Sequence, residues 1–584
     1  MAFANASTGP SSGAARRNIE TNRFLVADRW LACGIYSVNL ILHFILLRHP
    51  PPAFFYNLDE ADVTFSCLDR FLGLPSTTLM EPSSVLQMFS VPLFLLDFVI
   101  RRGLAGNQLA LLGSFSSYLA DSYADPRHHV TLVRALVAAI ACLGPALLFA
   151  ICRRLEASRV ISAFCALALL VQPAFFYQSL MAAGDSAGLT AMLCALTVLL
   201  YGNSDRWVAL ASAGLLQSMA ISFKLTMASS TLIVLAFLCF HPAVRSRRVT
   251  QDLQFAAGLL AGFLLWCPYI WVEPLRFAKA VFGNINRPGS HADVYQFLYL
   301  LQESAGAIGV IVAAVLVIAS VVVFLVSPAK DLVIALLCCL VLMAVPLFFR
   351  ATTAHSRYFM PLVLPPLLCF VTGIRGLERY SSSRILTAVL GVVVVAMALT
   401  LARSQAAIHG PDDLVDALRA EPRIPAGGKI YVPEDAGTIY ALRLPRTSYV
   451  RISARAKEEL YGGRGVTMFL LQNGIPEKAI RILVTNFNEK EQANATRTAV
   501  AAESEVSSDR DVFLYRAPHS TDSDLVFSRV SWAEVDLAKA LETLQSKEPV
   551  ALLVKLDATP PRAGKRVWQG RQWAWYTNES AAIH

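Results

Sequence analysis

Two adjacent carboxylates, Asp59 and Glu60, lie in a loop shortly after the first strongly apolar segment of the chain. Charged groups are costly near a bilayer, so acids at such a place usually bind or react with something. A carboxylate there can serve as a general base that removes the proton from an attacking hydroxyl group. Neighbouring side chains need not share a face, so one acid can react while the other orients a partner or a metal ion. The alternative is a solvated pair of acids or a helix N-cap.

Other polar side chains are candidates to join this acidic pair. Asp125 precedes the next long apolar segment, where the loop returns to the same membrane face, and it either completes the site or caps the following helix. His128 and His129 suggest a metal site, but consecutive side chains rarely converge on one ion, so a structural role is favoured. His291 lies in a long connection, 273–303. Because long connections are often functional, His291 is a candidate substrate contact.

Two cations occupy turns on the same expected side of the membrane. Lys224 separates two short apolar segments, where it offers a point charge to a phosphate or extends toward lipid headgroups. Arg357 lies where the chain enters a later apolar segment, and its guanidinium suits a bidentate phosphate contact or an interfacial anchor. The prolines that follow Arg357 would interrupt a regular helix and open a groove. In a third turn, Asp185 is predicted to be the N-cap of the next helix, and a functional role is the alternative.

The composition places these residues in a polytopic helical membrane protein. The 584 residues are 55% hydrophobic and only 16% charged, whereas an average soluble protein has about a quarter charged residues. About 20 apolar residues span a bilayer as a helix. Eleven apolar segments approach this length and are predicted to be transmembrane helices: 30–47, 130–151, 160–180, 186–201, 207–221, 226–240, 255–271, 305–326, 332–349, 358–371 and 385–402.

The distribution of Lys and Arg orients these helices. The alternate loops that include Arg153, Arg154 and Arg159 are richer in basic residues than the remaining short loops, which predicts a cytoplasmic N-terminus. Residues 1–29 are predicted to be a disordered cytoplasmic tail. Segment 84–100 is apolar enough to cross the membrane, but a crossing would invert every later loop. It is therefore predicted to be interfacial or re-entrant within a long first outer loop, 48–129. The excess of basic residues, 51 − 42 = 9, is spread over loops rather than gathered as nucleic-acid binding requires.

The chain from residue 403 to residue 584 has the character of a soluble domain. Strands are predicted at 429–432, 481–485, 512–515 and 551–556, and helices at 411–418, near 479–480 and at 532–544. Strands that alternate with helices indicate an α/β domain. An odd number of crossings would place this domain outside the cytoplasm. All eleven cysteines precede residue 370, so no disulfide framework is expected in it.

Taken together, these features resemble the integral-membrane glycosyltransferases of the C-type superfamily, most closely the protein O-mannosyltransferases and the lipid A aminoarabinose transferases. The resemblance covers about residues 25–400. It rests on Asp59-Glu60, on Asp125-Pro126 followed by Leu132-Val133-Arg134, on the turn at Lys224, and on Arg357-Tyr358-Phe359-Met360-Pro361.

The resemblance implies an inverting transfer of a sugar from a polyprenyl phosphate to a hydroxyl group, at the outer face of a bacterial inner membrane. It implies that Asp59 is the general base and that Lys224 and Arg357 neutralise the departing lipid phosphate. The remaining candidates are then expected to contact substrate: Glu60, Asp125, His291 and Tyr358. The acceptor would be a lipid, a glycan or a protein.

Three alternatives remain open at the level of sequence. No cofactor is certain from the sequence, but the acidic pair can bind a divalent cation. The chain could instead be a transporter or flippase of lipid-linked envelope precursors. Transporters place ionisable groups near the bilayer midplane and often have inverted repeats, whereas here these groups gather at segment ends and no repeat is evident. A non-catalytic scaffold whose exported domain binds a partner is the third alternative.

Overall fold

The computed structural model describes a few isolated positions and the ranges 12–48, 84–103, 127–202, 207–241, 249–272, 291–324, 330–352, 355–374, 383–409, 429–433, 449–451, 511–516, 525–527, 530–555, 564–570 and 573–578. It divides into two compact units, each of which is described by itself. The first comprises Met1–Arg48, Leu79–Val85 and Arg134–Ala402, and the second comprises His49–Thr78, Leu86–Val133 and Arg403–His584.

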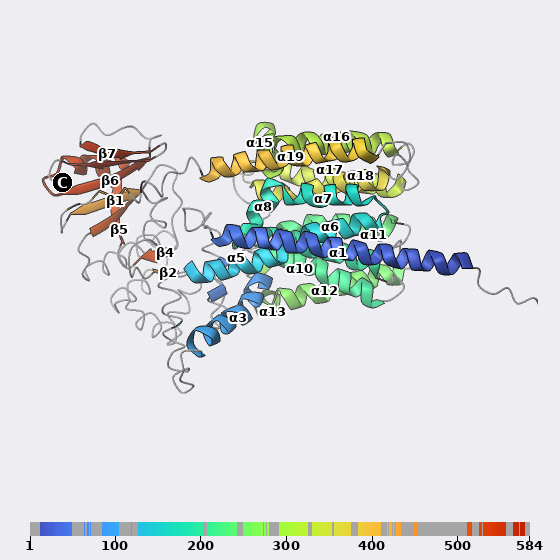
Figure 1. Ribbon diagram of the computed structural model, residues 1–584. Helices are drawn as coiled ribbons and strands as arrows, with labels where there is room; N and C mark the ends of the chain where they lie inside the picture. Colours follow the sequence, from blue (N-terminus) through green and yellow to red (C-terminus); the bar gives the residue numbers. More distant parts are fainter. Residues whose placement is uncertain are drawn as a thin grey trace, which may run out of the picture. The chain divides into compact units, whose positions relative to one another are not determined.

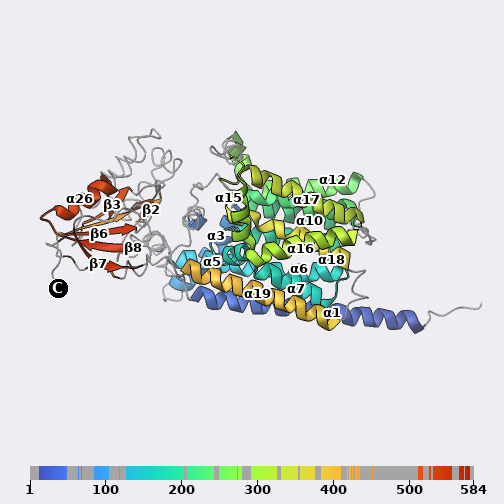
Figure 2. The same cartoon turned by 90° about the horizontal axis from the view of Figure 1, so that it is seen from above.

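The first unit is a bundle of helices whose axes run roughly parallel or antiparallel in both views (Figures 1 and 2). Most of them are rich in Leu, Val, Ala and Phe on all sides, as expected of helices surrounded by apolar material. Their bounds are α1 (Ser12–Arg48), α5 (Arg127–Ala141), α6 (Leu143–Arg154), α7 (Arg159–Leu170), α8 (Pro173–Leu180), α9 (Asp185–Tyr201), α10 (Trp207–Phe223), η3 (Leu225–Ser230), α11 (Thr231–Phe240), α12 (Val249–Trp266), α13 (Tyr269–Val272), α15 (Val294–Ala305), α16 (Ala307–Phe324), α17 (Lys330–Phe349), η4 (Ser356–Val363), α18 (Leu364–Ile374) and α19 (Ser383–His409).

Several helices have the length and composition of membrane spans. Among the described residues, three qualify singly: Val26–Leu47, His128–Arg154 and Lys330–Phe349. Two bent helix pairs, α7 with α8 and α15 with α16, raise the number to five if each pair is one span. All eleven predicted segments fall on helices. The class of polytopic helical membrane protein is therefore supported, and the number of eleven crossings stays a prediction.

The bends in the bundle have local causes. Pro173 begins α8 and cannot donate a backbone hydrogen bond to α7, and the two helices meet at 61°. Gly306 separates α15 from α16 with φ of +76°, a conformation that glycine adopts without strain, and these helices meet at 99°. The crosswise helix α15 exposes Tyr295 and Tyr299. Tyrosines of this kind are enriched where a helix lies at a membrane surface.

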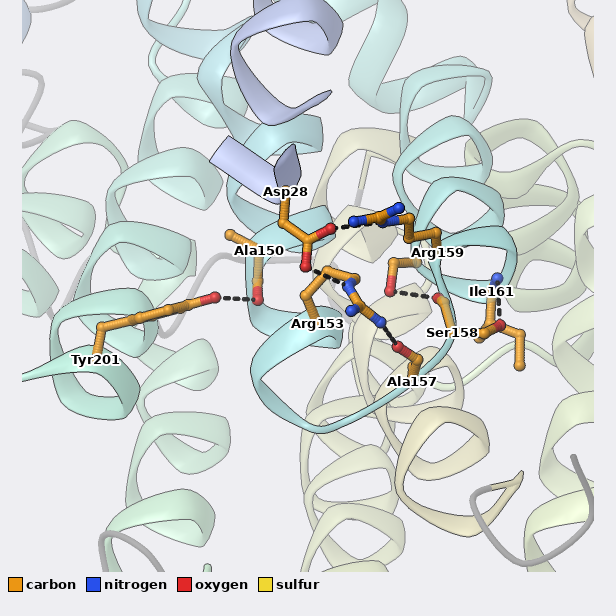
Figure 3. Close-up of polar contacts among 9 residues, drawn as sticks. Asp28, Ala150, Arg153, Ala157, Ser158, Arg159, Ile161 and Tyr201 are labelled. Carbon is orange, nitrogen blue, oxygen red and sulfur yellow. Dashed lines mark hydrogen bonds and ion pairs between the residues drawn. The ribbon is translucent and has the colours of Figure 1, made fainter. Parts of the chain in front are cut away.

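One end of the bundle is fastened by an acidic residue of α1. Asp28 accepts hydrogen bonds from Arg153 at 2.9 Å and from Arg159 at 2.7 Å, which flank the turn between α6 and α7 (Figure 3). Arg153 also donates to the carbonyl of Ala157 within that turn. Two cations that sequence analysis assigns to a cytoplasmic loop are thus neutralised by a residue of the first helix.

Glycines allow α10 and α12 to pack closely. A Cβ atom added at Gly258 would lie 2.1 Å from the carbonyl oxygen of Ala211, and one at Gly214 would lie 2.2 Å from that of Phe255. Gly258 and Gly262 form a G-x-x-x-G pattern on α12. Small residues at this spacing bring helix backbones together in membranes, where packing rather than the hydrophobic effect joins helices.

Substitution of Gly258 by alanine should therefore lower the midpoint of thermal unfolding of the detergent-solubilised protein. Overpacking of a close contact typically costs about 1–3 kcal/mol. Gly391→Ala is the matched control, because a Cβ at Gly391 in α19 meets nothing within 4 Å. Alanine favours a helix by up to about 1 kcal/mol over glycine, so this variant should be unchanged or more stable. Equal midpoints for the two variants would contradict the close packing.

The second unit contains a six-stranded sheet of order β5-β3-β1-β6-β8-β7. β1 (Lys429–Pro433) pairs in parallel with β3 (Asp511–Arg516) and with β6 (Val550–Lys555), and β3 pairs in parallel with β5 (Val530–Asp536). β8 (Trp573–Thr577) runs antiparallel between β6 and β7 (Lys565–Gln569). A short ribbon of β2 (Tyr449–Arg451) and β4 (Leu525–Phe527) stands apart from this sheet.

The core of this sheet unit explains its strand pattern. Trp575 is fully buried, and its indole nitrogen donates to the carbonyl of Ala417 at 2.5 Å. Leu552 and Val554 of β6 pack with Tyr576 and with Leu544, which follows the helix α26 (Leu537–Glu542). Buried strands of this kind are expected in a sheet that helices cover.

Several predictions for these regions can be compared with the described elements. The strands at 429–432, 512–515 and 551–556 are confirmed, but the helix at 532–544 is wrong in its first half, which forms β5. Pairing of Ser531 and Trp532 with β3 determines this strand, which the local sequence does not show. Segment 481–485 lies outside the described residues. The expected disordered tail 1–29 is helical from Ser12 onward.

Candidate functional site

Of the predicted site residues, Lys224, His291, Arg357 and Tyr358 are described by the structure. Asp59, Glu60 and Asp125 lie outside the described residues, so their predicted roles are untested. The described residues belong to the helical unit, and the site is built from that unit alone.

Lys224 occupies the break between α10 and the 3₁₀ helix η3. Its backbone is extended, with φ of −156° and ψ of 125°, because the α-helix ends at Phe223. The carbonyl of Lys224 accepts a hydrogen bond from the amide of Met227 at 2.9 Å, which starts the 3₁₀ turn. The residue is only 5% exposed. Lysine is rarely so deeply buried without a charged or polar group to meet it.

Arg357 lies in the 3₁₀ helix η4, which follows an extended residue, His355. It is 8% exposed, and its guanidinium carbon lies 5.5 Å from the ring centroid of Tyr358. The ring of Tyr358 in turn meets that of His355 edge-on, with centroids 5.4 Å apart. The side-chain amide of Gln172, before α8, donates to the carbonyl of Met360 at 3.4 Å. These contacts fix the orientation of the segment that carries Arg357.

The tertiary structure brings these two cations to the same end of the bundle. The segment η3 contacts both η4 and α9, and η4 also contacts α8, α15 and α17. We call this region the η3–η4 end. Two buried cations on neighbouring segments of an apolar bundle can both contact one anion, and charges interact more strongly away from water. Lys224 and Arg357 thus lie on segments that contact each other, and their common outer membrane side stays a prediction.

His291 lies at the surface, unlike the two buried cations. Its amide donates to the hydroxyl oxygen of Thr352 at 3.1 Å, and its Nδ1 lies 3.3 Å from the same oxygen. These contacts join the start of the α15 region to the turn before η4. His291 is exposed, so it can meet a substrate only at the surface of this end.

Asp185 also lies at this end, but it does not have the predicted role of N-cap of α9. The N-cap of α9 is Gly184, and Asp185 is the first helical residue, with no side-chain cap hydrogen bond. A Cβ at Gly184 would lie 2.3 Å from the carbonyl oxygen of Phe223. The N-cap prediction is therefore wrong, because this close approach of the α10 backbone requires glycine at the cap position. The Asp185 side chain is 0% exposed, and neither carboxyl oxygen has a hydrogen-bond partner among the described residues.

His128 and His129, by contrast, belong to a polar cluster in the second unit. Tyr118 donates to Asp97 at 2.7 Å, His128 meets the other carboxyl oxygen at 2.8 Å, and His129 lies 2.9 Å from the Tyr118 hydroxyl. The cluster joins the start of α5 to α3 (Ser84–Phe98), which is followed by the π-helical turn η1 (Val99–Gly103). Among the described residues no three groups are arranged to hold a metal ion. The favoured structural role of the two histidines agrees with these contacts.

The contacts within this cluster change the pKa of the Asp97 carboxyl. Burial raises its pKa, but hydrogen bonds from Tyr118 and His128 and the charges of His128 and Arg101 outweigh burial, so the pKa lies below its ordinary value. Burial and the neighbouring Asp97 raise the pKa of Tyr118. A depressed carboxyl pKa stabilises the fold above the unfolded-state value, about 4, and this contribution is lost as pH falls through the folded-state value.

Replacement of Asp97 by Asn should weaken the attachment of α3 at pH 7. Loss of a charged acceptor that meets several donors typically costs about 1–3 kcal/mol. Amide hydrogen exchange of residues 84–103 should be faster in the variant at pH 7, and the difference should shrink as the pH falls below about 4 toward the folded-state pKa. Asp331→Asn, an exposed acid at the start of α17, should leave this exchange unchanged. Equal protection of Asp97→Asn and the unaltered protein at pH 7 would contradict the role of the cluster.

Comparisons with known proteins give a distant structural similarity. No protein-family model matches the chain, and no curated protein sequence matches it. A solved structure, the crystal structure of ArnT from Cupriavidus metallidurans bound to undecaprenyl phosphate, is 13% identical and has a TM-score of 0.43. The similarity covers 96% of this chain and 99% of that chain. It extends along almost the full length of both proteins, at a TM-score too low to establish a shared activity.

Proposed function

We propose that the protein is an inverting glycosyltransferase that moves a sugar from a polyprenyl-phosphate donor to a hydroxyl-bearing acceptor. The observation that supports this proposal is the burial of Lys224 and Arg357 on neighbouring segments at the η3–η4 end. A lipid phosphate is an anion that arrives from the apolar phase, and fixed cations at a helix end are suited to receive it. Glu60, Asp125, His291 and Tyr358 would contact the substrates around this pair.

The proposed reaction needs a base and a stabilised leaving group. Asp59 removes the proton of the acceptor hydroxyl while its oxygen attacks the anomeric carbon from the face opposite the phosphate. The bond between the anomeric carbon and the phosphate oxygen breaks, and the electron pair leaves with the lipid phosphate. Lys224 and Arg357 stabilise the charge that develops on this phosphate. Inversion at the anomeric carbon follows from the single displacement.

The placement of charge favours an enzyme over a transporter. Lys224 and Arg357 both lie in 3₁₀ breaks at helix ends rather than within the long helices. A transporter would be expected to hold its ionisable groups near the bilayer midplane. The proposal includes eleven crossings of a bacterial inner membrane, a cytoplasmic N-terminus, a membrane domain over 30–402 and an extracytoplasmic domain over 403–584.

The proposal can be tested in a strain that lacks the chain. Mass analysis of envelope glycolipids, glycans and glycoproteins should show the loss of one sugar, and the complemented strain should regain it. The purified protein in liposomes should then transfer that sugar from the corresponding polyprenyl-phosphate donor. Movement of a lipid-linked precursor across vesicles, with no glycosyl product, would instead support the transporter.

A further inference from the structure

The η3–η4 end contains buried polar groups whose partners are not supplied by the residues that the structure describes. Among the described residues, hydroxyl or carboxyl oxygens without a hydrogen-bond partner occur at the following positions of this end: Asp185, Ser186, Ser222, Thr226 and Ser304. Asp185, Ser186 and Ser222 are each 0% exposed. A buried polar group without a hydrogen bond typically costs 1–3 kcal/mol, and more when it is charged. Such groups at one place indicate a ligand that supplies the missing partners.

Asp185 is the most informative of these groups. It is in the first turn of α9, where the helix dipole and the free backbone amides favour negative charge. Among the described residues it forms no ion pair and no hydrogen bond. A carboxylate only accepts hydrogen bonds, so the ligand must present donors to it.

Close packing places Asp185 beside the turn that carries Lys224. Gly184, which precedes Asp185, touches the carbonyl of Phe223, which precedes Lys224. One turn further along α9, a Cβ at Gly188 would lie 3.3 Å from the Cβ of Phe223 and 2.9 Å from the side chain of Met227. The first turn of α9 is thus held against the α10–η3 turn. A group that donates hydrogen bonds to Asp185 would therefore lie next to a group that contacts Lys224.

We propose that Asp185, together with Ser186 and Ser222, receives the hydroxyl groups of the sugar while Lys224 and Arg357 hold the phosphate to which it is attached. This inference rests on the proposed function and adds the location and class of the sugar. A serine hydroxyl both donates and accepts, as a sugar hydroxyl does, and the carboxylate accepts a sugar hydroxyl proton. The combination fits a neutral, hydroxyl-rich sugar. An ammonium group only donates hydrogen bonds, so at this place on the sugar it would match the carboxylate but not the donor capacity of the serines.

The test measures binding of two lipids, a polyprenyl phosphate with a neutral hexose and the same polyprenyl phosphate without sugar. Asp185→Asn keeps the size of the side chain. It should weaken binding of the sugar-bearing lipid about tenfold or more, as expected for the loss of a hydrogen bond to a charged group. Binding of the sugar-free lipid should not weaken. Lys224→Ala should weaken the binding of both lipids. The matched control is Asp331→Asn, an exposed acid in the first turn of α17, which should change neither.

The unliganded variant provides a second readout. Asp185→Asn should be at least as stable to heat as the unaltered protein, because the buried carboxylate has no hydrogen-bond partner to lose in the part of the chain that the structure describes. A lower unfolding midpoint with equal weakening of both lipids would show a structural role and overturn the inference. A third lipid, a polyprenyl phosphate with an amino sugar, tests the class of sugar. If Asp185→Asn weakens binding of this amino-sugar lipid more than binding of the hexose lipid, the assignment to neutral sugars is overturned. If neither lipid binds the unaltered protein, the proposed function itself fails.

Discussion

Asp59→Asn is expected to reduce sugar transfer by about 10²–10⁴-fold while the protein remains folded in the membrane. A general base contributes about this much to proton abstraction from an attacking hydroxyl. The amide has nearly the same size as the carboxylate but cannot take up the proton, so the loss should appear in the turnover number. The measurement is transfer by purified protein with a defined polyprenyl-phosphate sugar, at saturating donor.

The same loop offers a matched control. Asp62→Asn removes an equal charge three positions further along the chain and should retain most of the activity. Binding of the sugar-free lipid phosphate should be the same in the two variants. Undiminished transfer by Asp59→Asn would remove Asp59 from the role of base, and an equal loss in Asp62→Asn would indicate a general effect of the loop's charge.

Lys224→Ala and Arg357→Ala are each expected to lower transfer by about 10²–10³-fold, the usual loss when one preorganised group that stabilises developing charge is removed. Both side chains are buried at the η3–η4 end, where little water can replace the missing charge. The variants should have a higher KM for the donor and a lower kcat. The KM for the acceptor should change much less.

Two further variants define what these cations do. Arg357→Lys should recover only part of the activity, because lysine keeps the charge but loses the planar, bidentate contact with phosphate. Lys330→Ala removes an exposed cation at the start of α17 and should leave the kinetics unchanged. Equal losses toward donor and acceptor in the Lys224 and Arg357 variants would show that the two residues only shape the fold.

The helical class of the protein could be predicted from sequence because it depends on local composition. Each apolar segment falls on a helix, since long runs of Leu, Val and Ala satisfy their backbone groups internally wherever they lie. The strands β1, β3 and β6 were predicted for a similar reason, as short runs of buried residues. The strand β5 was mistaken for a helix, because its conformation depends on pairing with β3.

The sequence by itself determined which side chains are available and on which turns they lie, including the cations Lys224 and Arg357. Tertiary structure alone decided that η3 and η4 are neighbours, and that both cations are buried there. It also changed Asp185 from a predicted helix cap to a buried carboxylate without a partner among the described residues. That change depends on contact between the backbones of Gly184 and Phe223, which are far apart in the chain. Local sequence patterns determine helices, whereas the burial of a charged side chain and the identity of its neighbours depend on packing between distant segments.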